Sequence, residues 1–191
     1  MGVAARAMMH HTKRRATPVL TANFVSRCAP GEAVIEVEKI IQSTQFSRLQ
    51  ARLVQNGGEK VRMSGTFAVE RNECLPERYE SPPPEIAPLE ECVPIPGIPH
   101  YPIFSNMDVR LDPAYTGWLQ GNLASESGMK GRVRFRQDRA FDLLAVPLAA
   151  DAFPPAVLST QGLVSWVPTI EFSLNIRNVP RTNWLKCSFR T

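Results

Sequence analysis

The sequence predicts an α+β fold in which two antiparallel sheets each wrap a central helix. Three observations support this prediction. A helical segment followed by a run of strands occurs twice, a proline-rich segment separates the two occurrences, and each occurrence is too short to bury a core alone. The 191 residues are 43% hydrophobic and 21% charged, which is typical of a globular domain.

The first occurrence opens with residues 2–12, GVAARAMMHHT, whose helix formers and apolar spacing predict a helix. Alternating and β-branched segments then predict an antiparallel meander. Its strands are LTANFVS, AVIEVEKII, FSRLQARLVQ and KVRMSGTFAV. The sequence NGGE at 56–59 predicts a tight hairpin between the last two strands.

A connector follows at residues 71–102, which hold nine of the seventeen prolines. Proline neither donates to a sheet ladder nor continues a helix, so this stretch predicts an extended linker. The predicted organisation is therefore a first half at 1–70, the linker at 71–102 and a second half at 103–191.

In the second half, NMDVRLDP and KGRVRFRQ predict strands, residues 141–152 predict a helix, and VPTIEFSLNIR and NWLKCSFR predict two further strands. The segments LTANF (20–24) and FSLNI (172–176) align, with Asn23 and Asn175 at equivalent positions. This order of elements predicts an internal duplication.

Charge and cysteine content narrow the function. The net charge is +4, and two basic regions flank the acidic linker, which favours an anionic ligand over a broad nucleic-acid surface. The four cysteines lack zinc-binding spacing, so we expect no metal. No apolar run reaches the length of a membrane helix, so we expect a cytoplasmic protein without a membrane span.

Two long segments resemble a known family. TPVLTANFVSRCAPGEAVIEVEKIIQSTQFSRLQARLVQNGGEKVRMSGTFAV resembles the first half of thioesterase-like double-hotdog proteins related to acyl-CoA thioesterase II. RFRQDRAFDLLAVPLAADAFPPAV, followed by WVPTIEFSLNIRNVP, resembles their second half. The resemblance implies a double hotdog and an acyl-CoA or other acyl-thioester substrate, with coenzyme A as part of the substrate and no separate cofactor. By comparison with the family, the usual first and last strands are missing.

The resemblance also implies a catalytic site. In such enzymes an Asp at the end of the second hotdog helix, a hydroxyl residue on the next strand and a Gln on a later strand hold the hydrolytic water. Asp151 matches the Asp and Thr169 matches the hydroxyl residue, whereas nothing matches the Gln because the chain stops at Thr191. A carboxylate in an apolar setting can act as general base, since desolvation raises its pKa. The alternative for Asp151 is a capping role before Pro154.

The arginines of KGRVRFRQDR predict a second binding element. Arg132, Arg134 and Arg136 share one face of the predicted strand, and guanidinium groups bind phosphate, so they are candidates for the phosphates of coenzyme A. The alternative is a solvated basic face. No aromatic stacking platform is evident beside them in the sequence, so nucleic-acid binding is not expected.

Two other functions compete with thioester hydrolysis. One is a hotdog protein that binds acyl-CoA without turnover, which the missing Gln favours. The other is an acyl-thioester hydratase or dehydratase, which would need a histidine such as His10 or His11 in the pocket. Unpaired sheet edges also predict that a second copy of the chain can associate with the first.

Overall fold

The computed structural model describes residues 1–70, 81–96, 102–164 and 167–191. The chain forms two compact units. Unit 1 contains Met1–Pro76, Asp142–Leu148 and Pro168–Val179, and unit 2 contains Glu77–Phe141, Ala149–Val167 and Pro180–Thr191. Two segments of the second half therefore belong to the same unit as the first half.

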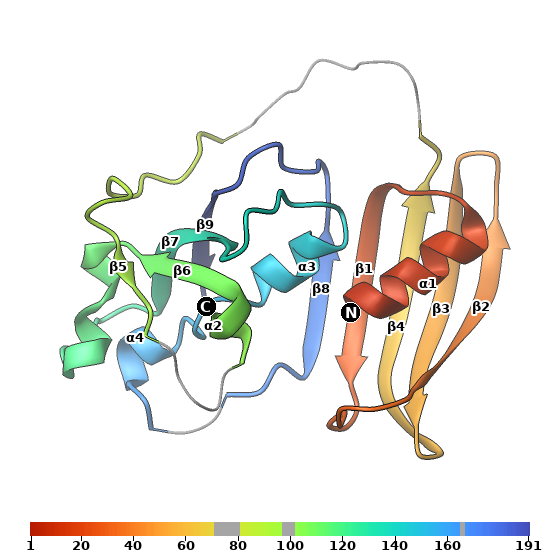
Figure 1. The fold of residues 1–191 in the computed structure, drawn as a ribbon, viewed down its shortest axis with the longest axis horizontal. Coiled ribbons are helices and arrows are strands. Elements are labelled where there is room, and N and C mark those ends of the chain that lie inside the picture. The colour runs from red at the N-terminus through yellow and green to blue at the C-terminus, as the bar shows by residue number, and fades with distance from the viewer. Residues whose placement is uncertain (71–80, 97–101, 165–166) are drawn as a thin grey trace. The chain divides into compact units, whose positions relative to one another are not determined.

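Unit 1 consists of one helix and a five-stranded antiparallel sheet, which we call sheet A. Its strand order is β2-β3-β4-β1-β8 (Figure 1). The elements are α1 (Gly2–Thr12), β1 (Ala16–Phe24), β2 (Val34–Gln42), β3 (Phe46–Gln55), β4 (Gly58–Ala68) and β8 (Glu171–Asn175). The helix and the four strands predicted from the first half are thereby confirmed.

The hairpin between β3 and β4 is confirmed as well. Asn56 and Gly57 connect the strands and both have positive φ, 53° and 73°. Two successive positive φ angles define the turn whose twist matches antiparallel strands, and asparagine followed by glycine is the sequence that adopts it most readily. The turn fixes the register of the two longest strands of sheet A.

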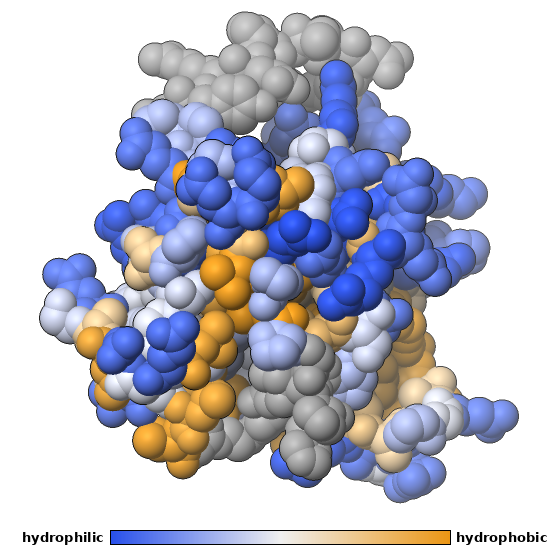
Figure 2. Space-filling model, turned by 60° about the vertical axis from the view of Figure 1, so that its left-hand side comes forward, coloured by the Kyte–Doolittle hydropathy of each residue, from blue (hydrophilic) through white to orange (hydrophobic). Residues whose placement is uncertain are grey.

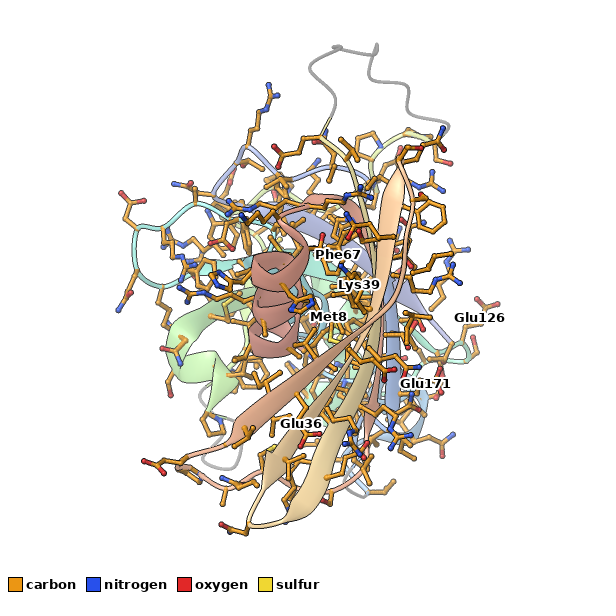
Figure 3. All side chains as sticks on the ribbon, turned by 90° about the vertical axis from the view of Figure 1, so that its right-hand side faces the viewer. Met8, Glu36, Lys39, Phe67, Glu126 and Glu171 are labelled. Atoms are coloured by element: carbon orange, nitrogen blue, oxygen red, sulfur yellow. The ribbon has the colours of Figure 1, made fainter. Side chains whose placement is uncertain are left out.

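Helix α1 covers one face of sheet A, which we call its inner face. Met8 from α1 and Phe67 from β4 are fully buried in one cluster. Both are labelled in Figure 3, which views helix and sheet from the side. Gly65 faces the same space, and a Cβ there would lie 2.7 Å from the Met8 sulfur and 2.8 Å from the Phe67 ring. The missing side chain at Gly65 therefore lets α1 approach the sheet.

Unit 2 contains a four-stranded antiparallel sheet, sheet B, with the order β5-β6-β7-β9. Its strands are β5 (Val93–Pro94), β6 (Met107–Leu111), β7 (Gly128–Phe135) and β9 (Leu185–Arg190). The helical segments of the second half are short: α2 (Ile103–Asn106), η1 (Pro113–Tyr115), η2 (Gly117–Gln120), α3 (Ala145–Ala150) and α4 (Leu158–Gln161). The strands predicted around 106–113, 167–177 and 183–190 are confirmed with shorter bounds, and the strand predicted at 130–137 is confirmed but lies two residues earlier, at Gly128–Phe135.

The helix predicted over 141–152 is shorter than the sequence pattern indicated, since α3 spans only Ala145–Ala150. The proline at 147 explains where α3 begins, because its ring would clash with the carbonyl group of Leu143 in a longer helix. The Asp142 side chain accepts a hydrogen bond of 2.8 Å from the Ala145 N–H and so caps this start.

The two aligned segments of the duplication lie side by side in sheet A. Strands β1 and β8 pair antiparallel, with Thr21 opposite Ser173 and Leu20 opposite Leu174. The alignment of LTANF with FSLNI puts Thr21 and Ser173 at equivalent positions, and these same two residues face each other in the sheet. The pairing is thus symmetric about Thr21 and Ser173, whose hydroxyl groups are hydrogen-bonded at 3.0 Å.

Candidate functional site

Asp151 follows α3 directly, in a turn that leaves its side chain exposed. The next three residues, from Ala152 to Pro154, are buried. Phe153 anchors this segment within unit 2 through a contact of 4.7 Å between its ring and that of Phe189. The carboxylate predicted as general base therefore stands at the surface, on a turn held from beneath by an aromatic pair.

Thr169 is also exposed, and it lies in an irregular segment two residues before β8 begins rather than on the strand. Its neighbour Ile170 accepts a backbone hydrogen bond of 2.8 Å from Phe24, which ties the segment to β1. Thr169 belongs to unit 1 and Asp151 to unit 2. Their catalytic roles stay predictions.

The three predicted phosphate ligands are each engaged by the protein itself. Arg132 and Arg134 lie on β7, alternating with the buried Val133 as the sequence predicted, and Arg136 follows the strand. The guanidinium of Arg132 donates to the carbonyl oxygen of Ala87 at 2.9 Å, and Arg136 donates to that of Phe104 at 2.9 Å. Phosphate binding by this row therefore remains a prediction.

Arg134 belongs to a cluster that the sequence reasoning missed. Its Nε lies 3.4 Å from Oδ2 of Asp108, which also receives Arg110 at 3.2 Å. Both guanidinium groups lie over the ring of Trp184, at 4.9 Å for Arg134 and 5.3 Å for Arg110. The expectation that the arginines have no aromatic neighbour is therefore wrong. The alternating pattern of each strand places Arg110 on one face of β6 and Arg134 on one face of β7. Only the register of the two strands shows that these faces lie on the same side of sheet B.

Other nucleophiles have structural roles. The Ser159 hydroxyl is buried, donates to Ala156 at 2.8 Å and accepts from the N–H of Gly128 at 3.1 Å. Burial raises the pKa of Cys187 to about 12, so its thiol stays protonated at neutral pH. Neither group is therefore an activated nucleophile.

The histidine required by a hydratase is not buried in unit 1. His10 and His11 are both exposed at the end of α1. His100 and Cys74 lie outside the described residues. Within the described ranges, no three His, Cys, Asp or Glu side chains are placed to hold a metal ion.

A hollow of about 310 Å³ lies on the outer face of sheet A, opposite α1. Ion pairs border it, including Glu36 with Arg52 at 2.5 Å. The lining residues are Glu36, Val37, Glu38, Gln50, Ala51, Arg52 and Arg62. It contains none of the predicted site residues. The described helices include none that is both long and apolar enough to span a bilayer.

Solved structures identify the fold class. A candidate thioesterase II from Thermobifida fusca YX superposes with a TM-score of 0.85 at 23% identity, covering 98% of this chain and 71% of that chain. A conserved hot dog fold protein from Alicyclobacillus acidocaldarius gives 0.81 at 20% identity, with 98% and 71% coverage. A candidate thioesterase from Novosphingobium aromaticivorans gives 0.81 at 15% identity, with 98% and 72% coverage. The chain is therefore an α+β protein with the hotdog fold, as predicted.

Family models narrow the class further. The model of the acyl-CoA thioesterase N-terminal domain matches residues 1–68, and that of the acyl-CoA thioesterase C-terminal domain matches residues 82–191. The chain belongs to this acyl-CoA thioesterase family. None of the curated proteins matches the sequence.

Proposed function

We propose that the chain hydrolyses acyl-CoA to a free acid and coenzyme A. The observation that carries the proposal is the match of family models to both halves of the chain, with Asp151 and Thr169 inside the matched 82–191 segment. Coenzyme A is part of the proposed substrate, and the proposal includes no separate cofactor.

In the proposed reaction Asp151 accepts a proton from water while Thr169 orients that water. The water oxygen forms a bond to the thioester carbonyl carbon, the carbon–sulfur bond breaks, and the proton held by Asp151 passes to the departing sulfur. No covalent acyl-enzyme is required. Because Asp151 is exposed, the acyl chain must supply the apolar surroundings that make its carboxylate a stronger base.

The phosphates of the substrate are assigned in this proposal to Arg132, Arg134 and Arg136, as the strand pattern predicted. Of these, Arg134 lies on β7 with 42% of its side chain exposed. Arg132 and Arg136 already donate to backbone carbonyl groups, so they would contribute charge more than new hydrogen bonds.

The test measures thiol release from a panel of acyl-CoAs by the unaltered chain and by Asp151→Asn. The amide cannot accept the proton, so we expect turnover to fall roughly a hundredfold to ten-thousandfold. Glu126→Gln is the matched control, because Glu126 is also an exposed carboxylate of unit 2 and is not one of the proposed site residues. Its turnover should be unchanged.

Release that survives in Asp151→Asn would refute the assignment of the base. Absence of release from the folded, unaltered chain, together with acyl-CoA binding, would instead establish the binding-only function. Circular dichroism of each variant ensures that loss of turnover is not loss of folding.

A further inference from the structure

The face of sheet B that carries Arg134 is strongly basic. The register places Asp108 opposite Arg134, Arg110 opposite Arg132, and Arg132 opposite Lys186, and opposed residues of neighbouring strands project to the same side. We call these five residues with Trp184 the basic face. It combines four cations with a single carboxylate, so three positive charges remain uncompensated among its own members.

This face is opposite the one that packs against the segment after α3. A Cβ on Gly131 would meet the ring of Phe153, and residues 131 and 132 project to opposite sides of β7. The basic face therefore lies on the side of sheet B opposite the segment that follows Asp151. A further carboxylate, Asp138, accepts a hydrogen bond from Asn183, the residue before Trp184.

Two guanidinium groups at the centre of this face are held in fixed positions. Asp108 is 6% exposed and binds Arg110 through both its oxygens, at 3.2 Å each, while Arg134 reaches the same carboxylate. Stacking of both groups on Trp184 restricts them further. A pair of cations that is already ordered loses little entropy when an anion binds.

The donors that remain point to the kind of ligand. In the described part of the chain Arg134 donates only through Nε, which leaves both of its Nη groups for an outside acceptor. One carboxylate cannot neutralise two guanidinium groups, and like charges at this spacing repel each other until a second anion arrives. Phosphate matches the planar fork of arginine and carries up to two charges.

We propose that Arg110, Arg134 and Trp184 form a binding site for a phosphate ester, with Lys186 and Arg132 adding charge. The compact arrangement around one carboxylate fits a single phosphate group. That the source of this phosphate is the nucleotide part of coenzyme A rests on the proposed function. β9 is an edge strand of sheet B, so Lys186 brings the basic face to the rim of this sheet.

The test measures binding of adenosine 3′,5′-bisphosphate, with adenosine as the probe that lacks phosphate. Arg134→Gln should weaken bisphosphate binding by about tenfold or more, because it removes charge-assisted hydrogen bonds. Arg134→Lys keeps the charge and loses the fork, so its affinity should lie between those of the unaltered chain and Arg134→Gln. Arg110→Gln should weaken binding to a similar degree.

Arg48→Gln is the matched control. Arg48 is exposed on sheet A and contacts Thr66, so the substitution changes net charge equally without touching the basic face. It should change the affinity by less than about twofold, since only screened long-range charge is lost. Circular dichroism confirms folding, and Arg134→Gln leaves the Arg110–Asp108 pair intact.

These measurements separate the phosphate site, coenzyme A as the source of the phosphate, and the proposed hydrolysis. Equal loss in Arg48→Gln and Arg134→Gln, or equal binding of adenosine and its bisphosphate, overturns the site. Binding to phosphatidylglycerol vesicles without binding to the bisphosphate overturns coenzyme A as the source. Bisphosphate binding that depends on Arg134, in a chain that releases no thiol from acyl-CoA, refutes the proposed hydrolysis and leaves the phosphate site standing.

Discussion

The two units differ in what covers the buried face of each sheet. In unit 1 the eleven-residue helix α1 lies across sheet A and contributes Met8 to a single buried cluster. In unit 2 sheet B is covered by short helical turns and irregular segments, among them the one that carries Phe153. A flexible side chain of a helix can move to accommodate a new methyl group, whereas the backbone of a neighbouring strand cannot. The same glycine-to-alanine substitution should therefore lower the free energy of unfolding by different amounts in the two units.

The largest effect is expected for Gly131→Ala in sheet B. A Cβ at position 131 would overlap the backbone carbonyl oxygen of Arg110 on β6, and it would lie 2.9 Å from the Phe153 ring. The carbonyl group cannot move without opening the β6–β7 ladder. We expect the free energy of unfolding, measured in urea, to fall by about 3 kcal/mol.

Gly128→Ala on the same strand is the control for this prediction. Its Cβ would meet Tyr115 at 3.5 Å and the backbone oxygen of Phe189 at 3.6 Å, which are ordinary contacts. Its unfolding free energy should change by less than about 1 kcal/mol. Similar stabilities for the two variants would show that the close approach of β6 to β7 does not constrain position 131.

A smaller, recoverable effect is expected for Gly65→Ala in sheet A. The new methyl group would meet the Met8 sulfur, the end of a flexible side chain, and the Phe67 ring. We expect a loss of about 1–2 kcal/mol in the free energy of unfolding. In the double variant with Met8→Ala the methyl group enters vacated space, so the two losses should be less than additive by about 1 kcal/mol.

If the two losses of unfolding free energy are strictly additive, the alanine methyl group at position 65 does not contact Met8, and Gly65 is not needed for the close approach of α1 to the sheet. Urea unfolding of the two single variants and the double variant measures this coupling directly.

Features written into short stretches of sequence were predictable. The NGGE turn and the period-two pattern of Val61, Met63 and Phe67 predicted β4, because these signals depend on neighbours in the chain. The helix at 141–152 was overextended because its apolar run hid the effect of Pro147. Local pattern therefore predicted the strands of both halves better than it predicted the second helix.

Features that depend on register were not predictable. The cluster of Asp108, Arg110 and Trp184 forms because β6, β7 and β9 are aligned at particular positions. Arg134 was found from its own strand, but its partners come from β6 and from the residue just before β9. Similarly, the alignment of LTANF with FSLNI predicted that the two segments are alike, while their direct pairing follows only from the sheet. The assignment of Asp151 and Thr169 came from the family resemblance, since aspartate in a turn and threonine before a strand are ordinary.

The smallest effect is expected at the symmetric point where β1 meets β8. Thr21 and Ser173 share an exposed hydroxyl hydrogen bond, and water can replace either partner. Ser173→Ala should therefore lower the free energy of unfolding by less than about 0.5 kcal/mol. Leu174→Ala, on the half-buried side of β8, should cost about 1–2 kcal/mol because it removes contacts with the buried cluster of unit 1. If urea unfolding shows the reverse order, the hydroxyl pair rather than apolar packing holds β8 to the first half. The polar Thr21–Ser173 contact would then hold β8 to β1, whereas apolar packing of Met8 holds α1 on sheet A.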